Sequence, residues 1–129
     1  MQRLRRYKKC KYIIRFNDMK TFKSLKFRKH LNPRMEGKQA ILFFKNGYGV
    51  SVVCGSREYG FYSNGLDTYE IAIIKGTKKK FEIVTNTPIA DDVIGFATAE
   101  QVTKVMEEVQ KLKKNDNYGN KKTLLVSNL

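Results

Sequence analysis

Catalytic chemistry in this chain would have to be built on very few residues. His30 is the single histidine, so any Ser-His or Cys-His dyad would need it. Cations surround it within residues 27–31, which should suppress its protonation and weaken it as an acid. The sequence also lacks the glycine-rich phosphate-binding motifs and the nucleophile-elbow motif. We therefore expect a protein that is not an enzyme and uses no cofactor, with His30 as a partly exposed residue of a basic patch.

Metal and thiol chemistry are also poorly supported. Asp91 and Asp92 are adjacent in a loop, but a cation that assists phosphoryl chemistry usually needs several converging carboxylates. After a Thr-Pro-Ile sequence, two such residues are typical of a turn or a helix cap, so no metal ligand is predicted. Cys10 lies among lysines, a setting that favours the thiolate and its oxidation but not catalysis. Cys54 reads as a small hydrophobic residue.

The positive charge of the chain is concentrated near its N-terminus. The 129 residues carry a formal net charge of +14, from 26 basic and 12 acidic side chains. Residues 1–38 hold 14 of the basic side chains and two of the acidic ones, which leaves the rest of the chain nearly neutral. Phosphate groups would relieve this repulsion and release condensed counterions. We predict that the segment binds nucleic acid or a nucleoprotein through Arg3, Arg5, Arg6, Lys8, Lys9, Lys11, Arg15, Lys20, Lys23, Lys26, Arg28, Lys29 and Arg34.

Aromatic residues alternate with these cations. Single strands and RNA favour such a pattern, because rings stack on bases while cations follow the phosphates. Aromatic residues are equally favoured in β-strands, so the alternative is a solvated basic arm that serves solubility. The rings concerned are those of Tyr7, Tyr12, Phe16, Phe22 and Phe27.

A second candidate surface lies in the glycine-rich loop of residues 55–68. This loop is long for a hairpin connection, and such loops are usually functional or mobile. Its side chains either form a surface that docks a host or defence protein, or fold back over one end of the sheet. The residues proposed for partner binding are Arg57, Tyr59, Phe61 and Tyr62.

Two hairpins and one helix should form the body that positions these residues. Residues 39–44 and 50–54 read as strands joined by Asn46-Gly47, which is typical of a type I′ turn. Residues 69–74 and 80–84 read as a second hairpin with its turn at 76–79. Thr98 and Gln101 form a capping-box pattern at the start of a helix over residues 99–114. The apolar stripe that should turn this helix toward the sheet consists of Val102, Val105, Met106, Val109 and Leu112.

The remaining segments are expected to extend or connect this body. Residues 24–28 alternate like a strand, and residues 11–16 suit a strand or a short helix. Residues 86–97 should be a connection that packs through Ile89, Val93, Ile94 and Phe96. The predicted fold is α+β, an antiparallel sheet of four or five strands with the helix on one face. A basic arm (1–38), a body (39–114) and a tail (115–129), in which residues 123–126 form an edge strand or stay disordered, make up the chain.

The sequence also indicates where the protein works. No apolar stretch is long enough for a signal peptide or a membrane span, and two cysteines are too few for a disulfide scaffold. We therefore expect a cytoplasmic protein without a membrane partner. Met19 is a second plausible start, so residues 1–18 are either a native arm or a product of how the gene start was assigned.

Three blocks of the body resemble small uncharacterised proteins encoded by phages and prophages. They are NGYGVSVV at 46–53, YEIAIIKG at 69–76 and TPIADDVIG at 87–95. The resemblance implies a phage origin and a hairpin-hairpin-helix body, and it supplies no catalytic site. The basic leader and the Lys78-Lys79-Lys80 run depart from the pattern. Small phage proteins without active sites commonly act by stoichiometric binding, either blocking a host or defence complex or organising nucleic acid. From this class and the basic charge we expect an inhibitor of a nucleoprotein defence complex such as a CRISPR nuclease.

Overall fold

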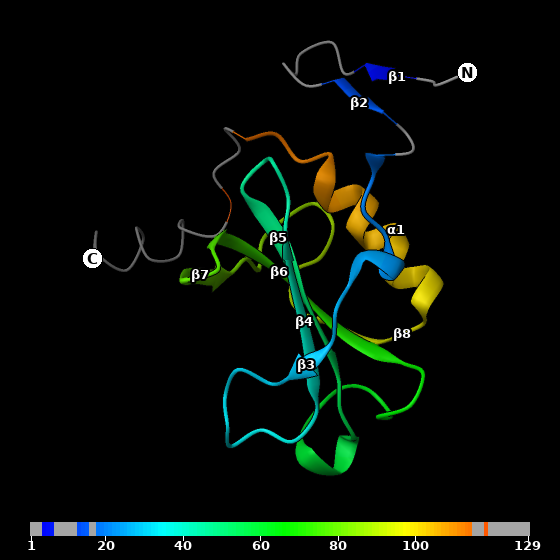
Figure 1. Cartoon of the computed structure of the whole chain (residues 1–129), viewed down its shortest axis with the longest axis vertical. Helices are drawn as coiled ribbons and strands as arrows, with labels where there is room; N and C mark the ends of the chain where they lie inside the picture. Colours follow the sequence, from blue (N-terminus) through cyan, green and yellow to red (C-terminus); the bar gives the residue numbers. More distant parts are fainter. Residues whose placement is uncertain (1–3, 7–12, 16–17, 115–117, 119–129) are drawn as a thin grey trace.

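The computed structural model describes residues 4–6, 13–15, 18–114 and 118, and these residues form an α+β fold (Figure 1). A separate antiparallel pair is formed by β1 (Leu4–Arg6) and β2 (Ile13–Arg15), so residues 13–15 are a strand rather than a short helix. The other elements are η2 (Phe22–Ser24), β3 (Arg28–Lys29), β4 (Lys38–Phe43), β5 (Tyr48–Cys54), η3 (Arg57–Tyr59), β6 (Tyr69–Thr77), β7 (Lys80–Ile83), β8 (Ile94–Ala97) and α1 (Ala99–Gln110).

The main sheet has six antiparallel strands in the order β3-β4-β5-β6-β7, and β8 also pairs with β6. β5 is its central strand, with six of its seven residues buried. Side chains alternate between the two faces of the sheet. On the face toward the core, Val50 lies between its pairing partners Leu42 on β4 and Ile73 on β6; Val50 and Ile73 are buried, and Leu42 is half-buried against them. The two predicted hairpins are confirmed, and β6 continues to Thr77, three residues beyond the predicted end.

Helix α1 covers one face of this sheet (Figure 1). Val102, Met106 and Val109 are fully buried against Tyr48, Val50, Val52, Ile71 and Ile73. The predicted capping box is confirmed, because Thr98 Oγ1 accepts from the Gln101 amide at 3.2 Å and Gln101 Oε1 accepts from the Thr98 amide at 2.8 Å.

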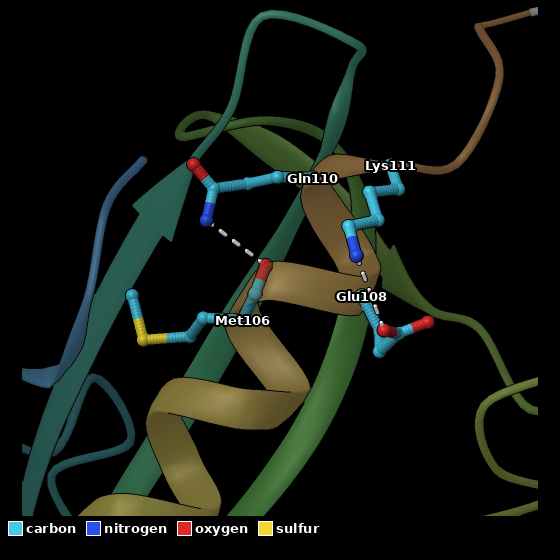
Figure 2. A network of polar contacts seen from close by, with 4 residues as sticks. All are labelled: Met106, Glu108, Gln110 and Lys111. Atoms are coloured by element: carbon cyan, nitrogen blue, oxygen red, sulfur yellow. Dashed lines mark hydrogen bonds and ion pairs between the residues drawn. The ribbon is translucent and has the colours of Figure 1, made fainter. Parts of the chain in front are cut away.

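The helix ends at Gln110, four residues before the predicted end. The buried side chain of Asn46 explains this, because its Nδ2 donates to the carbonyl oxygens of Val109 and Leu112, both at 2.9 Å. In a continued helix the Val109 carbonyl would accept from the amide four residues later, and the Asn46 side chain supplies a donor in its place. Lys111 consequently lies outside the helix, where its Nζ is 3.6 Å from Glu108 Oε2 (Figure 2).

Asn46 also overturns the predicted turn type. A type I′ turn needs positive φ at both central residues, but only Gly47 has one, at 89°. Asn46 keeps negative φ while its Oδ1 accepts from the Tyr48 amide at 3.1 Å, and the Gly47 amide donates to the Phe44 carbonyl at 3.1 Å. The buried hydrogen bonds of the side chain select this turn.

The expected connection at residues 86–97 is partly a strand. Residues 94–97 form β8, which pairs with β6 around a β-bulge. Ile89 and Ile94 pack on the core as predicted, but Phe96 is 47% exposed and has a φ of 51°. Its amide donates to the Tyr62 carbonyl at 2.8 Å, and this backbone bond turns the ring outward.

Residues 24–28 also differ from the prediction of a strand. The chain forms the 3-10 turn η2, in which the Thr21 amide donates to Ser24 Oγ at 3.1 Å, and only Arg28–Lys29 pair with β4. Of the tail, only residue 118 is described, so the proposed edge strand at 123–126 lies outside the described residues.

Candidate functional site

The predicted basic residues fall into two groups. Arg3, Lys8, Lys9 and Lys11 lie outside the described residues, and Arg5, Arg6 and Arg15 are placed through the backbone of β1 and β2 alone. The second group is exposed on the six-stranded body. It consists of Lys20, Lys23, Lys26, Arg28, Lys29 and Arg34.

The first part of this second group is held against α1. Gln110 accepts from the Lys20 amide at 2.8 Å through Oε1 and donates to the Lys20 carbonyl at 2.9 Å through Nε2. The same Nε2 donates to the Met106 carbonyl at 3.0 Å (Figure 2). The Phe22 amide donates to Thr103 Oγ1 at 3.1 Å. These backbone contacts fix the path of the chain while the lysine side chains stay in solvent.

The aromatic residues of this segment turn inward. Phe22 and Phe27 pack on Tyr69 with ring centroids 5.0 and 5.7 Å apart, and both rings join the core beneath α1. Both rings therefore contribute to the fold. They remain half-buried, and with Lys23 they line a second, smaller hollow of about 470 Å³. The same alternation suits a strand or edge segment that buries one side.

A different apolar surface lies beside the cations, on the face of β4 that is turned away from α1. Ile41 and Phe43 occupy this face, because they pair with Ser51 and Gly49 while the intervening Leu42 packs in the core. Gly49 leaves room for the Phe43 ring, which a Cβ at this position would approach to 3.0 Å. The ring of Phe81, on β7, packs against that of Phe43, with ring centroids 5.9 Å apart and an angle of 62° between the ring planes.

Ile41 and Phe43 form the floor of a groove with a volume of about 870 Å³. We name it the β4 groove. Its basic rim consists of Lys26, Arg28 and Lys29 at the β3 side and Lys78 in the β6–β7 turn. Gln39, whose Nε2 donates to Ser51 Oγ at 2.8 Å, lies at the β3 end.

The charged side chains that line the β4 groove are all positive. None of its described lining residues is acidic. All four rim cations are exposed, and none forms an ion pair with another residue in the part of the chain that the structure describes. Cations that neutralise no internal carboxylate remain available to an external anion.

His30 follows β3 and lies beside Phe61, with ring centroids 5.9 Å apart. Its Nδ1 accepts from the Asn32 amide at 3.0 Å. Burial lowers the pKa of His30, and the nearby Glu70 carboxylate opposes this only in part. The sequence predicted that His30 would be harder to protonate, and the lowered pKa agrees in direction. The main cause is burial, however, and not the neighbouring cations.

The aromatic side chains of the loop of residues 55–68 do not all lie on the same side: one packs into the fold and two are exposed. Phe61 is 3% exposed, and a Cβ at Gly55 would collide with its ring, so Phe61 belongs to the fold and is not available to a partner. Tyr59 and Tyr62 are 55% and 50% exposed. The exposed Arg57 lies over the Tyr62 ring at 5.7 Å from its centroid.

The remaining candidates have local roles. Asp91 and Asp92 are exposed, and Asp92 Oδ1 accepts from the Val93 amide at 2.8 Å, as a turn-forming aspartate does. Among the described residues, no three His, Cys, Asp or Glu side chains gather where they could hold a metal ion. Burial raises the pKa of the Cys54 thiol, although Lys38 acts in the opposite direction. Cys10 lies outside the described residues.

Sequence reasoning missed the floor of the β4 groove. Ile41 and Phe43 read as parts of a central strand, and nothing in the sequence shows that one face of β4 stays uncovered. Lys78 was visible as part of an unusual lysine run, but its place opposite β3 depends on the sheet order. The apolar residues on both faces of β4 are typical of a strand that is covered on both sides, so this pattern did not indicate an open face.

Comparison with known proteins found no match for this chain. No protein-family model, curated protein or solved structure matches the sequence or its fold. The resemblance to phage proteins therefore remains a prediction. Within the described part of the chain, no helix combines the length and apolarity that crossing a membrane requires.

Proposed function

We propose that this protein binds nucleic acid, either free or within a nucleoprotein complex, through the exposed cations of residues 20–34 and the rim of the β4 groove. The observation that carries the proposal is the rim itself, where Lys26, Arg28, Lys29 and Lys78 surround one groove without a described acidic neighbour. A net charge of +14 adds long-range attraction for any polyanion.

We further propose that binding, not catalysis, is the biological activity. A phage-encoded protein of this kind would act stoichiometrically, by covering nucleic acid or the nucleic-acid channel of a host defence complex such as a CRISPR nuclease. No cofactor takes part in this proposal. The protein would work in the cytoplasm of the host cell, where both partners are present.

Salt dependence tests the proposal directly. Neutralising four phosphates of a single strand gives a slope of log K against log salt of about −2.8, so affinity should fall about fiftyfold between about 50 and 200 mM salt. Fluorescence anisotropy with labelled single-stranded and duplex oligonucleotides measures this slope. An affinity that does not change over this range would refute the proposal.

A pair of charge-matched variants locates the surface. The double variant Lys26→Gln/Arg28→Gln removes two rim cations, so the slope should become shallower by about 1.4 for a single strand. Lys104→Gln/Lys114→Gln removes the same charge from exposed residues of α1 and of the segment that follows it, neither of which lines the β4 groove, and should leave the slope nearly unchanged. Equal effects of the two variants would indicate a general charge effect and would contradict a located site.

A second candidate function rests on Tyr59, Tyr62 and Arg57, which form an exposed aromatic and basic surface on the loop of residues 55–68. Tyrosine and arginine are enriched among the residues that dominate binding to proteins. On this proposal the protein docks a host protein and the basic surface is incidental. Tyr59→Ala/Tyr62→Ala would then abolish inhibition of the target and leave nucleic-acid affinity intact, whereas the rim variant would do the reverse.

A further inference from the structure

We infer that the β4 groove is built for single-stranded nucleic acid, with bases on the Phe43 ring and phosphates on the rim. This inference rests on the proposed nucleic-acid binding and specifies its substrate. The β4 groove combines a basic rim with an apolar floor. A rim of four cations suits any polyanion, but the half-buried apolar floor formed by Ile41 and Phe43 suits only a polyanion that also offers apolar faces.

Only unpaired bases offer such faces. In a duplex the bases are stacked on one another and the outer surface is polar, so a duplex can contact the rim but gains nothing from the floor. A single strand exposes every base, and each base can stack on an aromatic ring whatever its identity. Flexible acidic peptides would also match the charge, but their carboxylates bring no flat apolar group to the ring.

The geometry of the rings leaves stacking surface available. Phe43 and Phe81 meet at 62°, in an edge-to-face arrangement. In such a pair, the ring that presents its edge keeps both faces free of its partner, and the other ring keeps one. Ile83 on β7, which lies in the same cross-strand row as Phe43, is 52% exposed and continues the apolar surface.

The cations lie at two ends of this surface. Arg28 pairs with Gln39 near the start of β4. Lys78 follows the end of β6, where Lys75 pairs with Tyr48 at the start of β5, and the neighbouring Gly49 pairs with Phe43 at the end of β4. The four residue steps from Gln39 to Phe43 span about 13 Å at the usual rise of a strand. A single strand of nucleic acid that runs along β4 would thus find cations to bind its phosphates on both sides of the apolar floor.

The first test compares Phe43→Leu with the unaltered protein. Leucine keeps the apolar contact with the fold but has no ring to stack on a base. Affinity for a single strand of about 12 nucleotides should fall at least about fivefold, with an unchanged salt slope, whereas affinity for a duplex of the same length should not change. Parallel arms with single-stranded DNA and RNA of matched sequence show whether the 2′-hydroxyl contributes.

The second test needs no loss of affinity. The chain contains no tryptophan, so Phe43→Trp places a single fluorophore on the floor of the groove. Single strands should quench its emission by stacking. Phe96→Trp, at a 47% exposed position on β8, is the matched control and should not be quenched.

The outcomes separate this inference from the proposed function. If the protein binds nucleic acid with a steep salt slope, but Phe43→Leu binds single strands normally and Phe43→Trp is not quenched, the groove inference is wrong and the proposed function stands. If the unaltered protein binds neither single strands nor duplexes, the proposed function itself fails. Should Phe43→Leu not fold, as circular dichroism would show, the quenching experiment still decides the matter.

Discussion

Asn46 offers the sharpest test of how this fold is held together, because one buried side chain joins the β4–β5 turn to the end of α1. It is 6% exposed and makes three hydrogen bonds, to the carbonyls of Val109 and Leu112 and from the Tyr48 amide. Replacing it with alanine removes all three bonds, although the Val109 carbonyl still accepts from the Leu112 amide at 3.2 Å.

The size of the effect follows from burial. The bonds to Val109 and Tyr48 are buried, whereas the bond to Leu112 is only partly so. Removing the buried acceptor of the Tyr48 amide costs about 1–3 kcal/mol, and removing one of the donors to the Val109 carbonyl costs about 1 kcal/mol. Water can replace the bond to Leu112. We expect Asn46→Ala to lower the free energy of unfolding by about 2–4 kcal/mol, which lowers Tm by about 8–16 °C in a chain of this size.

Asn46→Asp sharpens the test because the two side chains have nearly the same shape. Aspartate keeps the acceptor for the Tyr48 amide but presents a carboxylate oxygen to two carbonyl oxygens, so it should destabilise more than alanine at neutral pH. Burial and these carbonyls raise the pKa of the new carboxyl in the folded state above its ordinary ~3.9. The stability gained by protonation is therefore full below about 3.9 and is lost as pH rises through the folded-state pKa.

Urea unfolding of both variants and of the unaltered protein, followed by circular dichroism over a range of pH, measures these differences. Asn32→Ala is the control, since Asn32 is exposed and its Oδ1 accepts from the Arg34 amide at 3.0 Å in a solvent-facing turn, and its effect should stay within about 0.5 kcal/mol. An Asn46→Ala effect as small as that of the control would refute the proposed link between turn and helix. A deficit of Asn46→Asp that does not shrink on acidification would refute the assigned donor role of Nδ2.

Two further predictions concern the helix start and the pH dependence of stability. Thr98→Ala removes the capping oxygen that accepts from the Gln101 amide and should cost about 1 kcal/mol by urea unfolding, whereas Thr98→Ser should be nearly neutral; equal losses would contradict the cap. Burial lowers the pKa of His30 in the folded state, so its contribution to stability is full above about pH 6.5 and is lost as pH falls through the folded-state pKa. His30→Gln should therefore flatten the dependence of the unfolding free energy on pH in this window. An unchanged pH dependence would contradict the assignment.

The parts of the fold that the sequence predicted are those specified by local chemistry. The capping box at Thr98 and Gln101, the stripe that includes Val102, Met106 and Val109, and the strands on either side of Asn46-Gly47 all follow from short-range patterns. These patterns act within a few residues, so no knowledge of the tertiary structure is needed to read them.

The errors occur where a distant contact outweighs a local preference. The helix ends early because Asn46, more than 60 residues away, donates to the carbonyls of Val109, in its last turn, and Leu112, just beyond it. β8 forms because β6 extends far enough to pair with two successive strands along one edge. Phe96 points outward because its amide is bonded to Tyr62. None of these partners can be identified from the sequence around the affected residue.

The candidate site shows the same division between charge and shape. The positive surface was visible as composition, since charge is a sum over residues and is the same wherever the chain goes. The stacking surface was not, because the direction of a ring depends on which face of a strand is covered. Phe22 and Phe27 carry the expected pattern but pack on Tyr69 and the core, whereas Phe43 lacks the pattern and lines the β4 groove. The one feature that links the cations to a ring is the pairing of β3 with β4, which places Arg28 beside Gln39 and therefore brings the basic segment to the uncovered face of β4.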